Sequence, residues 1–225
     1  MDEFIVGLDL GQSRDYTALA VLQLIAGAKR AEAQYHLRYL ERPPLGTLYT
    51  AIVERVRELL ATPPLQARRT PLVIDRTGVG SAVTDMFTAA GLRPYAVTIT
   101  GGDSVVRENS YHVRVPKREL VGLLVALFQS GRLKVARNLE LAPALLDELL
   151  NFRVKVNLQT AHDSYEAWRE SAHDDLVLAT ALACWHAEHA PGPARITWGP
   201  VDDWDVYSPE TSGPAVSPHY WRTGR

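Results

Sequence analysis

Aspartates stand next to apolar segments at three widely separated places in the sequence. Asp9 and Asp75 each end a short apolar run, and Asp174 and Asp175 directly precede the long apolar stretch Leu176–His189. Sites in open α/β sheets form beyond the strand ends, where loops and helix N-termini converge. If the two apolar runs form neighbouring strands, these carboxylates therefore reach a common place.

Clustered carboxylates repel one another unless a cation neutralises them, so such a cluster predicts bound metal. Mg²⁺ suits the pattern because it keeps several waters and needs only a few carboxylates. Two divalent ions roughly 3.5–4 Å apart ionise a water and stabilise both the attacking and the leaving oxygen in phosphodiester hydrolysis. Taken singly, each aspartate is more typical of a turn former or a helix N-cap, so the prediction depends on their combination.

The apolar patterns also predict the elements that position these residues. Strands are expected over Phe4–Leu10, Tyr16–Ile25, Gln34–Glu41, Pro71–Asp75 and Arg93–Ile99. Helices are expected over Leu45–Leu60, from the Gly78-Val79-Gly80 turn through Ala90, and over Pro116–Gln129, Leu141–Leu150 and Leu176–His189. Residues Thr100–His112 are expected to form a loop, and Phe152–Trp168 a hairpin. This order predicts one α/β domain with a mixed sheet.

The composition changes after residue 190. Residues 191–225 are rich in Pro and Gly and include aromatic residues, namely Trp198, Trp204, Tyr207, Tyr220 and Trp221. We predict a domain over residues 1–190 and a tail over 191–225 that either packs along the domain or docks on a partner. A disordered tail is usually poor in aromatic residues.

Bulk properties restrict the class of protein. No apolar run reaches the roughly 18 residues needed to cross a bilayer, and the acidic N-terminus is unlike a signal peptide, which predicts a soluble intracellular protein. The net charge of −2 argues weakly against a protein that coats nucleic acid, but not against one that grips DNA locally. The single cysteine, Cys184, lies in an apolar segment and is predicted to be core.

The segments that contain the aspartates resemble the nuclease domain of the viral (tailed bacteriophage) genome-packaging terminase large subunit. The matching strings are Val6–Asp9 with Asp15–Val21, Val73–Gly80, His173–Ala181 and the helix entry Val115-Pro116-Lys117. The resemblance extends over about residues 4–190. It implies an RNase H-like, RuvC-type α/β fold with a mixed central sheet and helices on both faces.

The resemblance further implies an endonuclease that cuts double-stranded DNA, the concatemeric viral genome, with two Mg²⁺ or Mn²⁺ ions. Asp9 would bridge both ions, Asp75 would hold one and Asp175 the other, while Asp174 would assist or cap its helix. Which residue of the Asp174-Asp175 pair is the main ligand stays open. Asp15 would be an accessory carboxylate. Independently of the resemblance, the position of His173 directly before the aspartate pair predicts that it orients a ligand or caps its helix.

Partners and location follow from the same resemblance. They would be the terminase ATPase domain, the small terminase and the portal protein, in the cytoplasm of the infected host cell. The hairpin Phe152–Trp168 would lie beside the site and contact or gate DNA. The sequence has no Gly-x-x-x-x-Gly-Lys-Ser/Thr loop, so the motor is expected to be separate from these residues.

A locally basic middle segment is the candidate DNA-binding surface. We favour Arg107, Lys117 and Arg118, which flank a Gly-containing loop, and such residues would neutralise phosphates largely independently of sequence. Arg14 and Arg76 adjoin the predicted ligands and would hold the scissile phosphate or pair with a carboxylate. A solvated helix face is the ordinary explanation for such a set.

Three other functions stay open at this stage. A RuvC-like junction resolvase would share the chemistry but prefer branched DNA. Gly7-Leu8-Asp9-Leu10-Gly11 also resembles the phosphate loop of actin-like ATPases and sugar kinases, which need a second domain and a later glycine-rich adenosine loop. The third alternative is a non-catalytic module that binds a partner through the aromatic tail.

Overall fold

One mixed sheet of eight strands organises the computed structural model, which describes residues 3–11, 15–27, 29–66, 70–151 and 173–189. The strands are β1 (Glu3–Asp9), β2 (Ala18–Ile25), β3 (Gln34–Glu41), β4 (Leu72–Asp75), β5 (Tyr95–Thr100), β6 (Val106–Arg107), β7 (His112–Pro116) and β8 (Leu133–Val135). Their order across the sheet is β6-β7-β5-β4-β1-β2-β3-β8. Strands β1, β2 and β3 form an antiparallel meander, whereas β4, β5 and β7 continue the sheet in parallel from β1.

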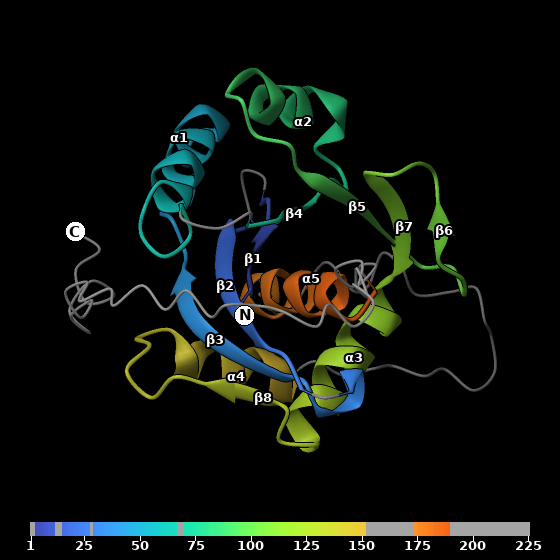
Figure 1. Cartoon of the computed structure of the whole chain (residues 1–225). Coiled ribbons are helices and arrows are strands. Elements are labelled where there is room, and N and C mark those ends of the chain that lie inside the picture. Colours follow the sequence, from blue (N-terminus) through green and yellow to red (C-terminus); the bar gives the residue numbers. More distant parts are fainter. Residues whose placement is uncertain (1–2, 12–14, 28, 67–69, 152–172, 190–225) are drawn as a thin grey trace, which may run out of the picture. The chain divides into compact units, whose positions relative to one another are not determined.

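Helices cover both faces of this sheet. They are α1 (Tyr49–Leu60), α2 (Gly80–Ala89), α3 (Lys117–Gln129), α4 (Ala142–Asn151) and α5 (Asp175–His189), and a 3₁₀ turn spans Arg30–Glu32. Figure 1 shows α1 and α2 on one side of the sheet and α3, α4 and α5 on the other. Each side has its own cluster of buried apolar residues, with Phe4 and Val6 of β1 in the α1–α2 cluster and Ile5 in the α5 cluster. This alternation is the period-2 pattern of a strand that is buried on both faces.

Helix α5 is the central helix of its layer. Its sequence is apolar on all sides, which is typical of a helix surrounded by protein, and nearly all of its residues are buried. At Gly7 of β1, a Cβ atom would lie 2.0 Å from the carbonyl oxygen of Ala179. Glycine at this position therefore lets α5 lie directly on β1. Cys184 is buried in α5, as the sequence predicted.

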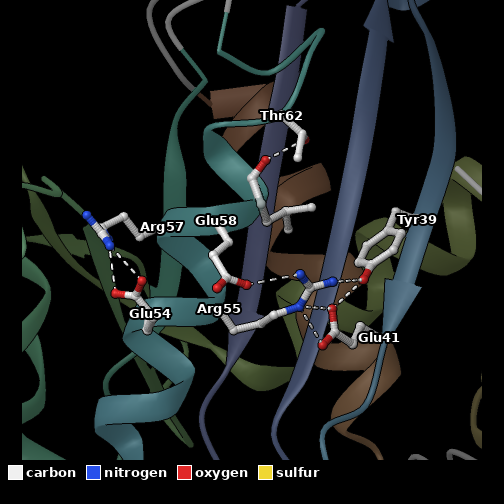
Figure 2. Close-up of polar contacts among 8 residues, drawn as sticks. Tyr39, Glu41, Glu54, Arg55, Arg57, Glu58 and Thr62 are labelled. Atoms are coloured by element: carbon white, nitrogen blue, oxygen red, sulfur yellow. Dashed lines mark hydrogen bonds and ion pairs between the residues drawn. The ribbon is translucent and has the colours of Figure 1, made fainter. Parts of the chain in front are cut away.

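A polar network fastens α1 to the sheet. Figure 2 shows the Arg55 side chain reaching from α1 to Tyr39 and Glu41 on β3. Arg55 Nε donates to both carboxylate oxygens of Glu41, at 2.9 and 3.0 Å, and Nη2 donates to the Tyr39 hydroxyl at 2.7 Å. Arg57 pairs instead with Glu54 on the exposed face of the same helix.

The predicted mixed α/β sheet with helices on both faces is confirmed. The predicted loop Thr100–His112 is wrong in part, because this segment contains β6 and the first residue of β7. Strand β8 was not predicted. Pro116 ends β7 and is the N-cap of α3, so the helix begins one residue later than expected, and α1 begins at Tyr49 rather than at Leu45.

The predicted hairpin at 152–168 lies outside the described residues. Among the described residues, no helix is long and apolar enough to span a membrane. Residues up to His189 form one compact unit. The predicted tail 191–225 also lies outside the described residues, so the boundary at residue 190 stays a prediction.

Candidate metal centre

Asp9 and Asp75 end two neighbouring parallel strands. Strands β1 and β4 pair with Leu8 opposite Ile74, so the two aspartates occupy the next position of the register. Neighbouring strands in a sheet lie about 4.8 Å apart. The two carboxyl groups therefore leave the backbone side by side, at the carboxyl ends of both strands.

Both carboxyl groups point to the face that α5 covers. Ile5 and Val73, an even number of residues before the two aspartates, pack in the core cluster on the α5 side, and positions separated by an even number share a face of the sheet. The N-terminus of α5 lies at the same end, because the Asp9 carboxyl group interacts electrostatically with those of Asp174 and Asp175. The three distant stretches of sequence thus converge on one place.

The electrostatics of the cluster reflect this crowding. Burial raises the pKa of Asp9 well above its usual range, and repulsion from Asp75, Asp174 and Asp175 raises it further. Burial also raises the pKa of Asp75, although the Thr77 backbone N–H donates to Asp75 Oδ1 at 2.7 Å and favours the charged form. The Asp9 and Asp75 carboxyl groups thus interact directly with each other, which affects the pKa of both residues. Carboxylates gathered in this way require protons or cations between them.

Two protein cations face the other pair of carboxylates. Lys117 Nζ donates to Asp174 Oδ2 at 2.5 Å, and Arg42 Nε donates to Asp175 Oδ2 at 2.6 Å. Within the described part of the chain, no three His, Cys, Asp or Glu side chains are already arranged as a metal-binding group. The donor set nevertheless consists of hard carboxylate oxygens, which are the ligands that suit Mg²⁺ and Mn²⁺.

Arg42 and Glu148 are site residues that the sequence analysis missed. Glu148 of α4 is 8% exposed and accepts hydrogen bonds from the first turn of α5, while Arg42 follows β3 and contacts both Glu148 and Asp175. Burial, followed by repulsion from Asp175, raises the pKa of Glu148 to about 7. A signal was available, because Glu148 continues the helical spacing of Leu141 and Leu145. An acid within an apolar stripe is rarely buried unless it is paired.

The two residues predicted to be accessory are both exposed. Asp15 is exposed and lines a cleft of about 400 Å³ together with Tyr49 and Val79. His173 is exposed, and its ring packs edge-on against Tyr16, with the ring centroids 5.1 Å apart. The accessory roles of Asp15 and His173 stay predictions.

The basic residues predicted to bind DNA are dispersed, and two of them lie near the cluster. Lys117 is ion-paired with Asp174, and Arg76 follows Asp75 in sequence and directs Nη1 to His112 Nδ1 at 3.2 Å. Both therefore have protein partners. Their roles toward a phosphate stay predictions.

Two other candidates for DNA binding also have protein partners. Arg107 on β6 donates to the Tyr95 hydroxyl at 3.0 Å, and Arg118 on α3 forms an exposed ion pair with Asp103. Arg14 lies outside the described residues.

A family model and one solved nuclease confirm the predicted RNase H-like fold. The family model described as a terminase RNase H-like domain matches residues 6–187. The large terminase nuclease from thermophilic phage G20c is similar in structure, with a TM-score of 0.54 and 24% identity over 81% of each chain. RuvC from Thermus thermophilus has a TM-score of 0.37 and 17% identity over 83% of this chain and 94% of its own. The fowlpox virus Holliday junction resolvase has a TM-score of 0.34 and 10% identity, covering 82% of this chain and 98% of its own. No curated protein matches the sequence.

Proposed function

The chain belongs to the terminase RNase H-like domain family, and from this premise we propose that it is a metal-dependent endonuclease that cleaves double-stranded DNA. The observation that carries the proposal is the convergence of Asp9, Asp75 and the Asp174-Asp175 pair at one end of the sheet. A carboxylate cluster beyond the strand ends is the ligand set that two-metal phosphodiester hydrolysis needs.

Within this proposal each aspartate has a role. The Asp9 carboxyl group interacts electrostatically with those of the other three aspartates. Asp9 would contribute to holding both Mg²⁺ or Mn²⁺ ions, with Asp75 holding one ion and Asp175 the other. Asp174 would assist from the N-cap position of α5. When bound, the metals supply an ionised water and stabilise charge on the scissile phosphate. The chain itself carries two of the four carboxylates at strand ends and the other two at the start of a buried helix.

The substrate and partners extend the proposal. The substrate would be concatemeric viral DNA that is cut during genome packaging, in the cytoplasm of an infected host cell. The partners would be the ATPase domain of the terminase, the small terminase and the portal protein. Support for these finer statements comes from family membership and from the similarity to the phage G20c terminase nuclease.

The decisive experiment is nicking of supercoiled plasmid by the wild type and by Asp9→Asn in Mn²⁺. The nicking rate of Asp9→Asn should be at least roughly 100-fold lower than that of the wild type, which corresponds to a loss of about 3 kcal/mol of charge stabilisation. Asp85→Asn, an exposed aspartate on α2, is the matched control and should retain wild-type activity. Most of the activity surviving in Asp9→Asn, with a normal melting curve, would defeat the proposal. A parallel assay on a four-way junction separates a packaging nuclease from a junction resolvase.

A further inference from the structure

Glu148 binds the N-terminus of the helix that presents Asp174 and Asp175. Its Oε2 accepts the backbone N–H groups of Leu176 at 3.0 Å and Val177 at 3.1 Å. The first N–H groups of a helix have no partner within the helix, so a carboxylate from another element satisfies them and complements the helix dipole. Since this carboxylate comes from α4, it fixes where α5 begins.

Arg42 connects this carboxylate to the predicted metal ligand. Its Nη2 donates to Glu148 Oε1, and its Nε donates to Asp175 Oδ2 at 2.6 Å. The guanidinium also lies over the Tyr16 ring, 5.2 Å from the centroid. The side chains of Arg42, Glu148 and Asp175 are 18%, 8% and 5% exposed, so these charges interact largely away from solvent.

We propose that Arg42 and Glu148, here called the α5 brace, are positioning residues that orient the Asp175 carboxylate for the divalent metal. The brace joins the end of β3, helix α4 and helix α5 at one point, and the proposal rests on the function proposed above. Arg42 occupies one oxygen of Asp175 and fixes the direction of the carboxyl group. Partners that hydrogen-bond a ligating carboxylate typically contribute 10–100-fold to metal affinity or activity.

The planar guanidinium is essential to this role. A guanidinium forks between two carboxylates in a fixed geometry, whereas a lysine ammonium offers the same charge without that geometry. A positioning role therefore differs from two simpler roles. If Arg42 supplied only charge, lysine would replace it, and if it competed with the metal, its removal would tighten metal binding.

The test is a Mn²⁺ titration, followed by the electron paramagnetic resonance signal of free Mn²⁺, on wild type, Arg42→Lys and Glu148→Gln. Each variant should bind Mn²⁺ about 10-fold more weakly than wild type. Arg38→Lys and Asp147→Asn are the matched controls, because both residues are exposed neighbours on β3 and α4, and they should bind as wild type. In nicking assays the Mn²⁺ concentration for half-maximal rate should rise, while KM for plasmid stays unchanged.

The outcomes are separable. Unchanged or tighter Mn²⁺ binding by Arg42→Lys overturns the positioning role while leaving the proposed nuclease intact, provided that Asp9→Asn loses the ion. Absence of Mn²⁺ binding by the wild type overturns the brace and the metal-dependent function together. If Glu148→Gln fails to fold, Arg42→Lys decides the matter alone, because it keeps the charge that Glu148 faces.

Discussion

The two neighbouring aspartates at the start of α5 have different surroundings. Asp175 is the first residue of the helix, and its side chain is 5% exposed and held by Arg42. Asp174 is the residue before the helix, and its side chain is 28% exposed and paired with Lys117. Sequence alone left open which of the two is the main ligand. The deeper burial and firmer orientation of Asp175 favour Asp175.

We therefore expect Asp175→Asn to reduce Mn²⁺-dependent nicking at least about 10-fold more than Asp174→Asn, since a ligand contributes more than its neighbour. Nicking rates at saturating Mn²⁺, together with melting curves for both variants, measure the difference. Equal losses in the two variants would instead assign them equal roles as ligands.

Lys117 offers a second prediction at the scale of single residues. Its ammonium lies at the edge of the carboxylate cluster, where a phosphate would approach, so Lys117→Ala should lower the slope of log binding constant against log salt by about one. Lys134→Ala, on the distant edge strand β8, is the control. A slope equal to that of the wild type would limit Lys117 to holding Asp174.

At the scale of elements, predictability followed the length and the periodicity of each segment. Strand β1 and helix α5 have continuous apolar patterns, and each of their ends was predicted to within one residue. The two residues of β6 and the three of β8 have no pattern of their own, because they become strands only by pairing with β7 and β3.

The same physical reason explains what was missed in the site. The aspartates stand at element ends, which a sequence reveals, so their convergence could be predicted. The contact between Arg42 and Glu148 joins residues that are distant in sequence and depends on how α4 packs against α5. Nothing local in the segment around Arg42 indicates such a partner.

The Arg55 network predicts how firmly α1 is attached. Arg55 and its partner Glu41 are partly buried, and Arg55 also binds Tyr39 on β3, so Arg55→Ala should lower the free energy of unfolding by about 1–2 kcal/mol. Arg57→Ala removes an exposed pair on the same helix and should leave the free energy of unfolding nearly unchanged. Urea unfolding measures both, and equal effects would show that the network adds nothing beyond a surface ion pair.

His186 in α5 predicts a dependence of stability on pH. Burial, with a smaller repulsion from Arg107, lowers the pKa of His186 from 6.5 to about 4, and its ring packs edge-on against Tyr95. The unfolded chain therefore binds the proton more readily between pH 6.5 and pH 4. The contribution of the neutral ring is complete above pH 6.5 and is lost as the pH falls toward 4, by at most about 3 kcal/mol.

His186→Phe should therefore flatten the pH profile in that window. The measurement is the free energy of unfolding of wild type and variant at pH 7.5 and pH 5. Relative to the wild type, the variant should have a higher free energy of unfolding at pH 5 than at pH 7.5. A difference that stays constant across the two pH values would contradict the assigned shift.

At the scale of the whole molecule, the sheet brings the site together and divides the core into two clusters. Both clusters of the described residues lie between Phe4 and Ala187, and the family match ends at residue 187. The compact unit likewise ends at His189. The residues of both core clusters and those of the candidate site therefore lie in the same stretch of chain.

This organisation predicts that a fragment ending at residue 190 folds as the whole chain does. The fragment retains every residue of both core clusters and all four aspartates, so its Tm should lie within about 3 °C of that of the full chain, which corresponds to roughly 1 kcal/mol. Its Mn²⁺-dependent nicking should also persist. A fall in Tm well beyond this range would show that the aromatic-rich residues 191–225 pack along the domain, because removing side chains that stabilise the domain also removes buried apolar area. An unchanged Tm would favour a tail that docks on a partner.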